Sequence, residues 1–191
     1  MSRSGAIEMS TKILDTEKHW FALRDLKRSN AIYPAYKQLS ELGIEVFTPM
    51  KWRITKRNGK QFGREVPVMP DLLFAYDTRK RLDPIVSQTP TLQYRYKKGG
   101  AYCEPIVVPE DDMNRFIGAV RAAEEPRYYS ADEIDSLMSG KSIRIVGGPM
   151  NGYEGKLLSV RGSKVKRIVI ELPNLLALSV KVDSEYIQVI D

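Results

Sequence analysis

The stretch SIRIVGGPMNGYEGKLLSV, residues 142–160, places four glycines between two runs of β-branched and aliphatic residues. Such runs on either side of a glycine-rich segment predict two antiparallel strands. Glycine supplies the positive φ angles that tight turns need. A phosphate-binding loop does not fit, because Met150 stands where its first glycine is needed and Leu157 follows Gly155-Lys156. We therefore predict that this stretch turns the chain between two strands.

Three more short β-rich runs follow this pair, and all five runs lie within the last part of the chain. The three runs are KRIVIEL, LALSVKV and YIQVI. Five short strands in about 50 residues predict a small five-stranded β-barrel over residues 141–191, because closure removes the exposed edges of a flat sheet.

The preceding part of the chain predicts an α+β domain over residues 18–123, with an antiparallel sheet flanked by helices. HWFAL, EVFTPMKWRITK and REVPVMPDLLFAYD have strand composition, and RNGKQFG favours a hairpin between the last two. Apolar residues at helical spacing predict two helices, one with Ser29 or Asn30 as N-cap and one over residues 109–125. Residues 1–17 are predicted to be a flexible tail, and residues 124–140 a linker.

Composition limits the chemistry that the chain can perform. The formal net charge is +6 and the sequence pI is about 9.3, which suits a polyanionic partner. Cys103 and His19 are the single cysteine and histidine, too few for a zinc site. No catalytic constellation, membrane span or signal peptide is recognised. We expect a cytoplasmic, monomeric protein that is not an enzyme, binds no metal or cofactor and does not contact a membrane.

Two parts of the sequence resemble one family. Residues 142–160 resemble a KOW motif, with an alternating strand, a G-P-x-x-x-x-x-G turn and a second strand. HWFAL, EVFTPM and REVPVMPDLLFAYD resemble the N-terminal domain of NusG-type transcription elongation factors, and the two domains follow in that family's order. Pro49-Met50 and Lys27-Arg28 are closer to RfaH-like specialised paralogues. The divergent loops resemble the paralogues that Bacteroides-type bacteria use to antiterminate capsular polysaccharide operons.

The resemblance implies where partners bind. In this family an apolar depression binds the clamp helices of RNA polymerase, and the matching residues here are Met69, Pro70, Leu72 and Phe74. The alternative is that Leu72, Leu73 and Phe74 are core. Lys27 and Arg28 match residues that face non-template DNA, with a solvated charge pair as the alternative. Pro149, Met150 and Tyr153 fall on the KOW turn that contacts ribosomal protein S10 or Rho, although Tyr153 could instead pack over its own turn.

A basic loop indicates nucleic-acid binding from its composition alone. Cations with no acid until Glu65 alternate with Trp52 and Phe62, which can stack on bases. The loop cations are Lys51, Arg53, Lys56, Arg57, Lys60 and Arg64. Arg95, in YRYKKGG, belongs to a second basic patch. The alternative is a hairpin that its charges keep in solvent.

These observations favour a transcription elongation factor or antiterminator that suppresses pausing and premature termination at specific operons, perhaps better described by its partners than by any chemistry. Those partners are RNA polymerase and either non-template DNA or nascent RNA. One alternative is a ribosome- or RNA-associated KOW protein. Another is an enzyme with an unrecognised phosphate site, which would show nucleotide binding.

Overall fold

The computed structural model describes residues 16–27, 31–100, 102–123, 125–130, 133, 140–159 and 165–190. The chain divides into two compact units, Met1–Glu110 and Asp111–Asp191. Within the described residues, no helix is both long and apolar enough to cross a membrane.

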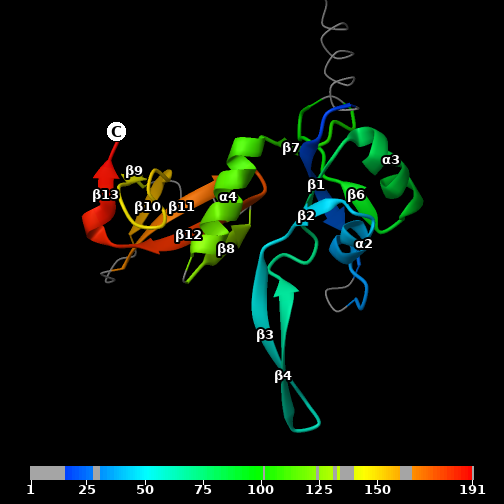
Figure 1. Ribbon diagram of the computed structural model, residues 1–191, viewed down its shortest axis with the longest axis horizontal. Coiled ribbons are helices and arrows are strands. Elements are labelled where there is room, and N and C mark those ends of the chain that lie inside the picture. The colour runs from blue at the N-terminus through cyan, green and yellow to red at the C-terminus, as the bar shows by residue number, and fades with distance from the viewer. Residues whose placement is uncertain are drawn as a thin grey trace, which may run out of the picture. The chain divides into compact units, whose positions relative to one another are not determined.

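The first unit is built on a five-stranded sheet in which β1 is central (Figure 1). Its strands are β1 (His19–Asp25), β2 (Glu45–Phe47), β5 (Leu73–Asp77), β6 (Leu92–Tyr94) and β7 (Val107–Val108). The order is β2-β5-β1-β6, β7 also pairs with β1, and all these pairings are antiparallel. Two helices, α2 (Ala35–Glu41) and α3 (Arg79–Gln88), belong to the same unit. The predicted α+β sheet with flanking helices is present.

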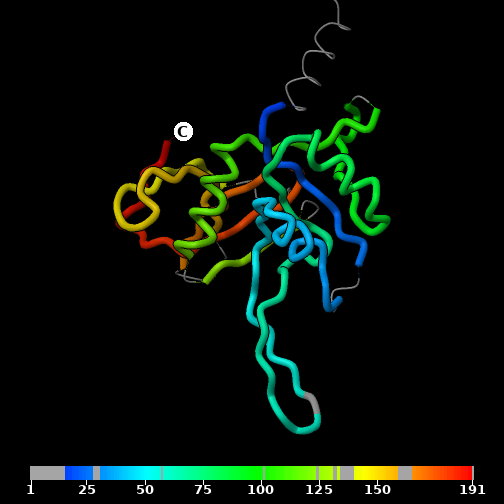
Figure 2. The backbone as a smooth tube through the Cα atoms, turned by 45° about the vertical axis from the view of Figure 1, so that its right-hand side comes forward, coloured from blue at the N-terminus to red at the C-terminus, as the bar shows by residue number. Residues whose placement is uncertain are grey.

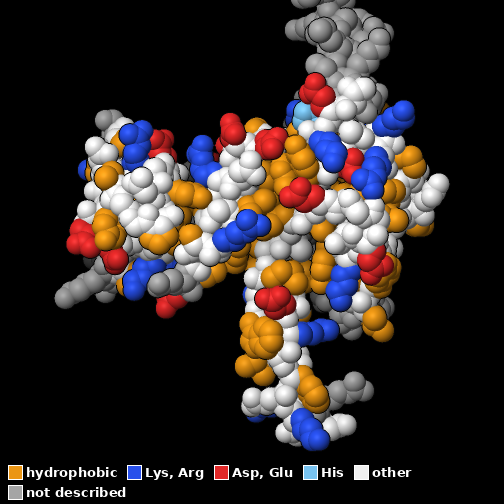
Figure 3. Space-filling model, viewed as in Figure 1, with side chains coloured by type: hydrophobic (Ala, Val, Ile, Leu, Met, Phe, Trp, Pro, Cys, Tyr) orange, Lys and Arg blue, Asp and Glu red, His pale blue; other side chains and the backbone are white. Residues whose placement is uncertain are grey.

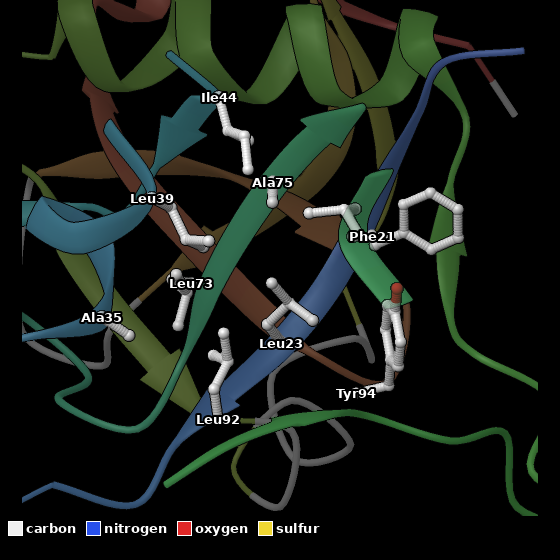
Figure 4. Packing of buried hydrophobic residues seen from close by; sticks show 10 residues of the cluster. Phe21, Leu23, Ala35, Leu39, Ile44, Leu73, Ala75, Leu92 and Tyr94 are labelled. Atoms are coloured by element: carbon white, nitrogen blue, oxygen red, sulfur yellow. The ribbon is translucent and has the colours of Figure 1, made fainter. Parts of the chain in front are cut away.

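Alternation along the strands forms the core of this unit. Phe21 and Leu23 of β1 point to the same face as Leu73 and Ala75 of β5, and all four are buried. Figure 4 shows these side chains together with Leu39 of α2 and with Leu92 and Tyr94 of β6.

Helix α2 begins later than the sequence predicted. Pro34 is its N-cap residue, and the Oδ2 atom of buried Asp25 accepts a hydrogen bond from the amide of Ala35 at 2.7 Å. The predicted caps, Ser29 and Asn30, lie outside the described residues. Asp25 at the end of β1 therefore supplies the acceptor that a local cap would give.

The predicted hairpin is present as a separate two-stranded sheet of β3 (Met50–Arg57) and β4 (Lys60–Pro67). Asn58 and Gly59 connect the strands with φ angles of 51° and 73°. Two successive positive φ angles characterise the type I′ turn, for which Asn-Gly is the preferred pair. Figures 1 and 2 show the hairpin extending away from the rest of its unit.

The second unit contains one α-helix, α4 (Glu110–Ala122), which begins at the boundary, and a six-stranded antiparallel sheet. Its strands are β8 (Arg127–Ser130), β9 (Ser142–Ile145), β10 (Glu154–Ser159), β11 (Lys166–Leu172), β12 (Leu176–Val182) and β13 (Ile187–Val189). A short 3-10 helix, η1 (Ser184–Tyr186), precedes β13. The strand order is β13-β9-β10-β11-β12-β8.

This sheet corrects two predictions. All five predicted strands are present, but β8 is a sixth, formed by residues predicted to be linker, and it pairs with β12. The pairings among the described residues run from β13 to β8 without closing the sheet. Most of the segment between β8 and β9 lies outside the described residues, as do residues 1–15 of the predicted tail. The local sequence RYYS gave no reason to place β8 in this sheet, since its pairing partner is about 50 residues away.

The glycine-rich stretch turns the chain between β9 and β10, as predicted. Gly147, Gly148 and Gly152 have positive φ angles of 107°, 66° and 84°. Gly155 has a different role, because a Cβ there would lie 2.2 Å from the carbonyl oxygen of Val169 on the neighbouring strand. That position needs glycine for close approach of two backbones.

Candidate nucleic-acid interface

The hairpin carries most of the predicted nucleic-acid-binding residues on exposed positions. Its exposed cations are Lys51, Arg53, Lys56, Lys60 and Arg64. None of these five forms an ion pair within the described part of the chain. The sixth predicted residue, Arg57, pairs with Lys60 through its backbone, and its side chain lies outside the described residues. These unpaired cations are available to phosphate groups.

Two aromatic residues in the hairpin have different surroundings. The indole ring of Trp52 lies over Gly63, where a Cβ would come within 2.2 Å of the ring. Phe62 is 52% exposed and stands directly opposite Thr55 in the register. The Thr55 hydroxyl donates a hydrogen bond of 3.3 Å to the carbonyl oxygen of Phe62. Hydrophobic and basic side chains both lie along the hairpin in Figure 3.

A cavity of about 270–370 Å³ class size, here ≈ 320 Å³, lies at the base of the hairpin. Its lining includes Tyr36 and Lys37 of α2 together with Arg64 and Val66 of β4. The cavity therefore joins the basic strand to the helix that follows β1. A mixed lining of aromatic, aliphatic and cationic side chains suits a group that is both planar and anionic.

The second predicted basic site, Lys27 and Arg28, is only partly described. Lys27 is half-buried, its Nζ donates to the carbonyl oxygen of Tyr33 at 2.9 Å, and the same atom lies 5.8 Å from the centre of the Tyr33 ring. This ammonium group is thus held by its own unit. Arg28 lies outside the described residues.

Arg95 also has a partner within its unit. Its guanidinium lies 2.9 Å from the Oδ2 atom of Asp71, and Arg24 lies 3.6 Å from the same atom. Arg95 is half-buried, and its Nε atom is buried without a hydrogen-bond partner. The structure therefore places Arg95 in a contact between β6 and the loop before β5, away from the cations of the hairpin sheet.

The predicted polymerase-binding segment is only partly accessible. Leu72 is 2% exposed and Phe74 is fully buried, so neither presents its side chain to a partner in this structure. Phe74 packs near Phe47, with ring centres 6.4 Å apart, and the Leu72 carbonyl accepts from the Thr48 hydroxyl. Met69 is half-buried and Pro70 is exposed. The core alternative is therefore correct for Leu72 and Phe74.

The predicted tip of the KOW turn is likewise divided. Pro149 is exposed, but Met150 is 6% exposed and lines a cavity of ≈ 170 Å³ together with Ile145 and Tyr186. Tyr153 is half-buried with its hydroxyl against Gly118 of α4. Met150 is thus a packing residue in this structure, because the turn folds it inward.

Sequence reasoning found the hairpin cations but missed their arrangement. The contact between Trp52 and Gly63, the Asp71 ion pairs and the cavity beside α2 depend on pairing across strands. Counting alternate positions from Met50 would have separated Trp52 from Arg53, because successive side chains of a strand point to opposite faces.

The fold and this surface define a two-unit α+β protein that presents a cationic hairpin suited to polyanions. The sequence profile of the family described as "Transcription termination factor nusG" matches residues 18–117, more than half of the chain. The protein therefore belongs to the NusG family, and this membership makes it a transcription elongation or termination factor, a class that works with RNA polymerase and nucleic acid. No curated protein matches the chain at a significant level.

Proposed function

We propose that this protein is an antiterminator that binds transcribing RNA polymerase and suppresses pausing and premature termination. The observation that carries the proposal is the exposed hairpin, whose cations have no ion-pair partners in the described chain. Such a surface contacts phosphates without reading sequence. An operon-specialised, RfaH-like role at polysaccharide operons belongs to this proposal and is supported by the resemblance of Lys27-Arg28 and Pro49-Met50.

Polymerase contact is proposed at the exposed edge of the first unit, formed by Met69 and Pro70. Met69 can adapt to an apolar partner surface because its side chain is flexible and polarisable. Leu72 and Phe74 support this edge from the core rather than touching the partner. The factor would act by holding the polymerase in an elongating state, with no covalent step.

The second unit is proposed to be a KOW barrel that recruits a protein partner. The five strands expected of such a barrel are present, and Pro149 is exposed on the turn between β9 and β10. Ribosomal protein S10 and Rho are the candidate partners that the KOW resemblance suggests.

A single-round transcription assay tests this function. RNA polymerase from the source organism would transcribe a template with a strong pause and a terminator, with and without the full chain. We expect shorter pauses and greater read-through with the wild-type protein. Pro70→Glu should lose this effect, because a carboxylate at an exposed apolar contact carries a desolvation cost.

Tyr102→Glu is the matched control, since Tyr102 is 98% exposed and lies on another loop of the same unit. It should retain wild-type read-through. If Pro70→Glu is fully active, the docking edge is wrong while the function stands. If wild-type protein neither binds polymerase nor changes read-through, the antitermination proposal fails. Binding to ribosomal RNA without polymerase would then favour an RNA-associated KOW protein.

A further inference from the structure

The two faces of the hairpin sheet carry different side chains. Residues that stand opposite each other in an antiparallel pair point to the same face. One face combines four exposed cations with an aromatic ring, and its residues are Lys51, Arg53, Thr55, Lys60, Phe62, Arg64 and Val66. We call this the cationic face. The opposite face carries Met50, Trp52, Ile54, Lys56, Gln61, Gly63, Glu65 and Pro67.

The cationic face contains an arrangement that the fold itself does not require. Arg53 and Arg64 stand directly opposite each other, and neither has a carboxylate partner within the described residues. Like charges in this position weaken a strand pair. Lys51 and Lys60 extend the same charge along the face. A bound polyanion would remove the repulsion, which makes this face suited to a phosphate backbone.

Phe62 lies among these cations and is half exposed. An exposed ring in a cationic groove is the arrangement by which proteins stack on unpaired bases. In a duplex the faces of the bases are covered by their neighbours, so Phe62 would have nothing to stack on. This combination favours a single strand over a double helix.

Trp52 has a different environment, although it is 66% exposed and next to Arg53 in sequence. One side of its ring covers the backbone at Gly63, and its register partner is Glu65, whose charge repels phosphate. Trp52 therefore stabilises the hairpin from the face opposite the cations.

We propose that single-stranded DNA lies along the cationic face, with a base stacked on Phe62 and phosphates beside Arg53 and Arg64. This inference rests on the proposed function, which supplies the occasion for contact with an exposed strand. DNA is chosen over RNA because the Thr55 hydroxyl beside Phe62 already donates to a backbone carbonyl. The other polar side chains described on this face are cations, which cannot accept a bond from a ribose hydroxyl.

Fluorescence anisotropy with the full chain and a labelled oligo(dT) of about 12 nucleotides tests this proposal. Phe62→Ala should weaken binding by about 5-fold to about 100-fold. Phe62→Trp should retain or increase affinity, which guards against a simple folding defect. Trp52→Phe is the matched control on the other face, and it should bind within about twofold of wild type because it keeps a ring over Gly63.

Salt dependence gives a second readout. Four cations predict that the logarithm of the binding constant falls with the logarithm of salt concentration with a slope of about −3, at about −0.7 for each. Arg53→Gln should make the slope shallower by about 0.7.

Three results would overturn the proposal. They are equal binding by Phe62→Ala and wild type, tighter binding of a duplex of the same length, and binding of oligo(U) more than about tenfold tighter than oligo(dT). The transcription assay separates this proposal from the function. Phe62-dependent DNA binding without any effect on read-through would refute antitermination alone, whereas read-through without such binding would refute the stacking site alone.

Discussion

The hydroxyl oxygen of Tyr153, at the start of β10, lies against Gly118 of helix α4, where a Cβ would stand 2.3 Å away. The ring carbon that carries this hydroxyl would be 3.7 Å from the same Cβ, an ordinary contact distance. Glycine inside a helix is unfavourable by about 1 kcal/mol relative to alanine. The close approach of Tyr153 thus explains a residue that helix propensity alone disfavours.

This relationship predicts a change of sign. Gly118→Ala should destabilise the wild-type protein by about 1–3 kcal/mol, because the hydroxyl must move out of a packed site. In a Tyr153→Phe background the same substitution should be neutral or stabilising by up to about 1 kcal/mol, since the clashing atom is gone. Urea unfolding of the four proteins gives the coupling energy. Equal effects in both backgrounds would mean that Tyr153 does not rest on α4 in solution.

The hairpin turn offers a prediction about backbone conformation alone. Gly59 has a φ angle of 73°, and a Cβ there would meet nothing within 4 Å. Gly59→Ala should therefore cost about 1–2 kcal/mol, the strain of a left-handed L-residue. Faster hydrogen exchange of the β3 and β4 amides would report it.

Asn58→Gly is the control for the turn, because glycine also adopts the φ angle of 51° found there. It should leave exchange of the hairpin amides close to wild type. Unchanged exchange in Gly59→Ala would contradict the assigned turn.

The sequence was sufficient for features that depend on near neighbours. Asn58-Gly59 between two β-rich runs indicated the hairpin, and glycines at 147, 148 and 152 indicated the turn before β10. Features that depend on distant pairing were not accessible. Strand β8 is recognisable only through its contact with β12, and the face that Leu72 or Phe74 presents depends on how the sheet is covered.

The candidate site shows the same limit. A basic composition identified the hairpin, but the cation-bearing face depends on strand register, and Arg95 was included because its partner Asp71 is distant in sequence. Helix α2 was predicted with a local cap, whereas its first amide is bound by Asp25 of β1. Such acceptors cannot be assigned until the chain is folded.

Asp25 should be important for joining β1 to α2. Its Oδ1 atom accepts from the Lys27 amide at 2.9 Å and its Oδ2 atom from the Ala35 amide at 2.7 Å. Asp25→Ala leaves both donors without this acceptor and should cost about 2–4 kcal/mol, whereas Asp25→Asn retains one acceptor oxygen and should cost less. Thermal unfolding measures the order. Equal loss in both variants would show that burial, rather than hydrogen bonding, makes Asp25 important.

Tyr94 predicts a dependence of stability on pH. Burial, and then a hydrogen bond of 2.8 Å to Asp83, raise the pKa of Tyr94 above its usual value near 10. The folded state therefore favours the neutral phenol. Its contribution is fully present below about pH 10 and is lost as pH rises further, because the unfolded tyrosine ionises first.

Tyr94→Phe should cost about 1 kcal/mol near neutral pH. The difference from wild type should shrink above about pH 10, when urea midpoints are compared across pH. Tyr102→Phe is the control, since exposed Tyr102 should contribute nothing at either pH. A difference that stays constant or grows with pH would contradict the neutral buried phenol.

Arg167 of β11 explains how β8 is held in the second unit. It is buried, its Nε donates to the Ser179 hydroxyl at 2.9 Å, and its Nη2 donates to the backbone carbonyls of Ser179, at 2.9 Å, and of Glu125. Burial, and then the charge of Arg127, lower the pKa of this guanidinium. Its planar group reaches β12 and the segment before β8 at once, which a lysine ammonium cannot do.

Arg167→Lys should therefore release β8 while leaving β9 and β10 paired. Hydrogen exchange should accelerate by at least about tenfold at residues 127–130, the loss expected from about 1.4 kcal/mol of local stability, with little change in β9 and β10. Arg127→Lys is the control, because exposed Arg127 keeps its backbone pairing with Ser179. Uniformly faster exchange across the second unit would mean that Arg167 supports the whole sheet. Unchanged exchange would mean that the strand pairing of β8 with β12 is sufficient without the guanidinium.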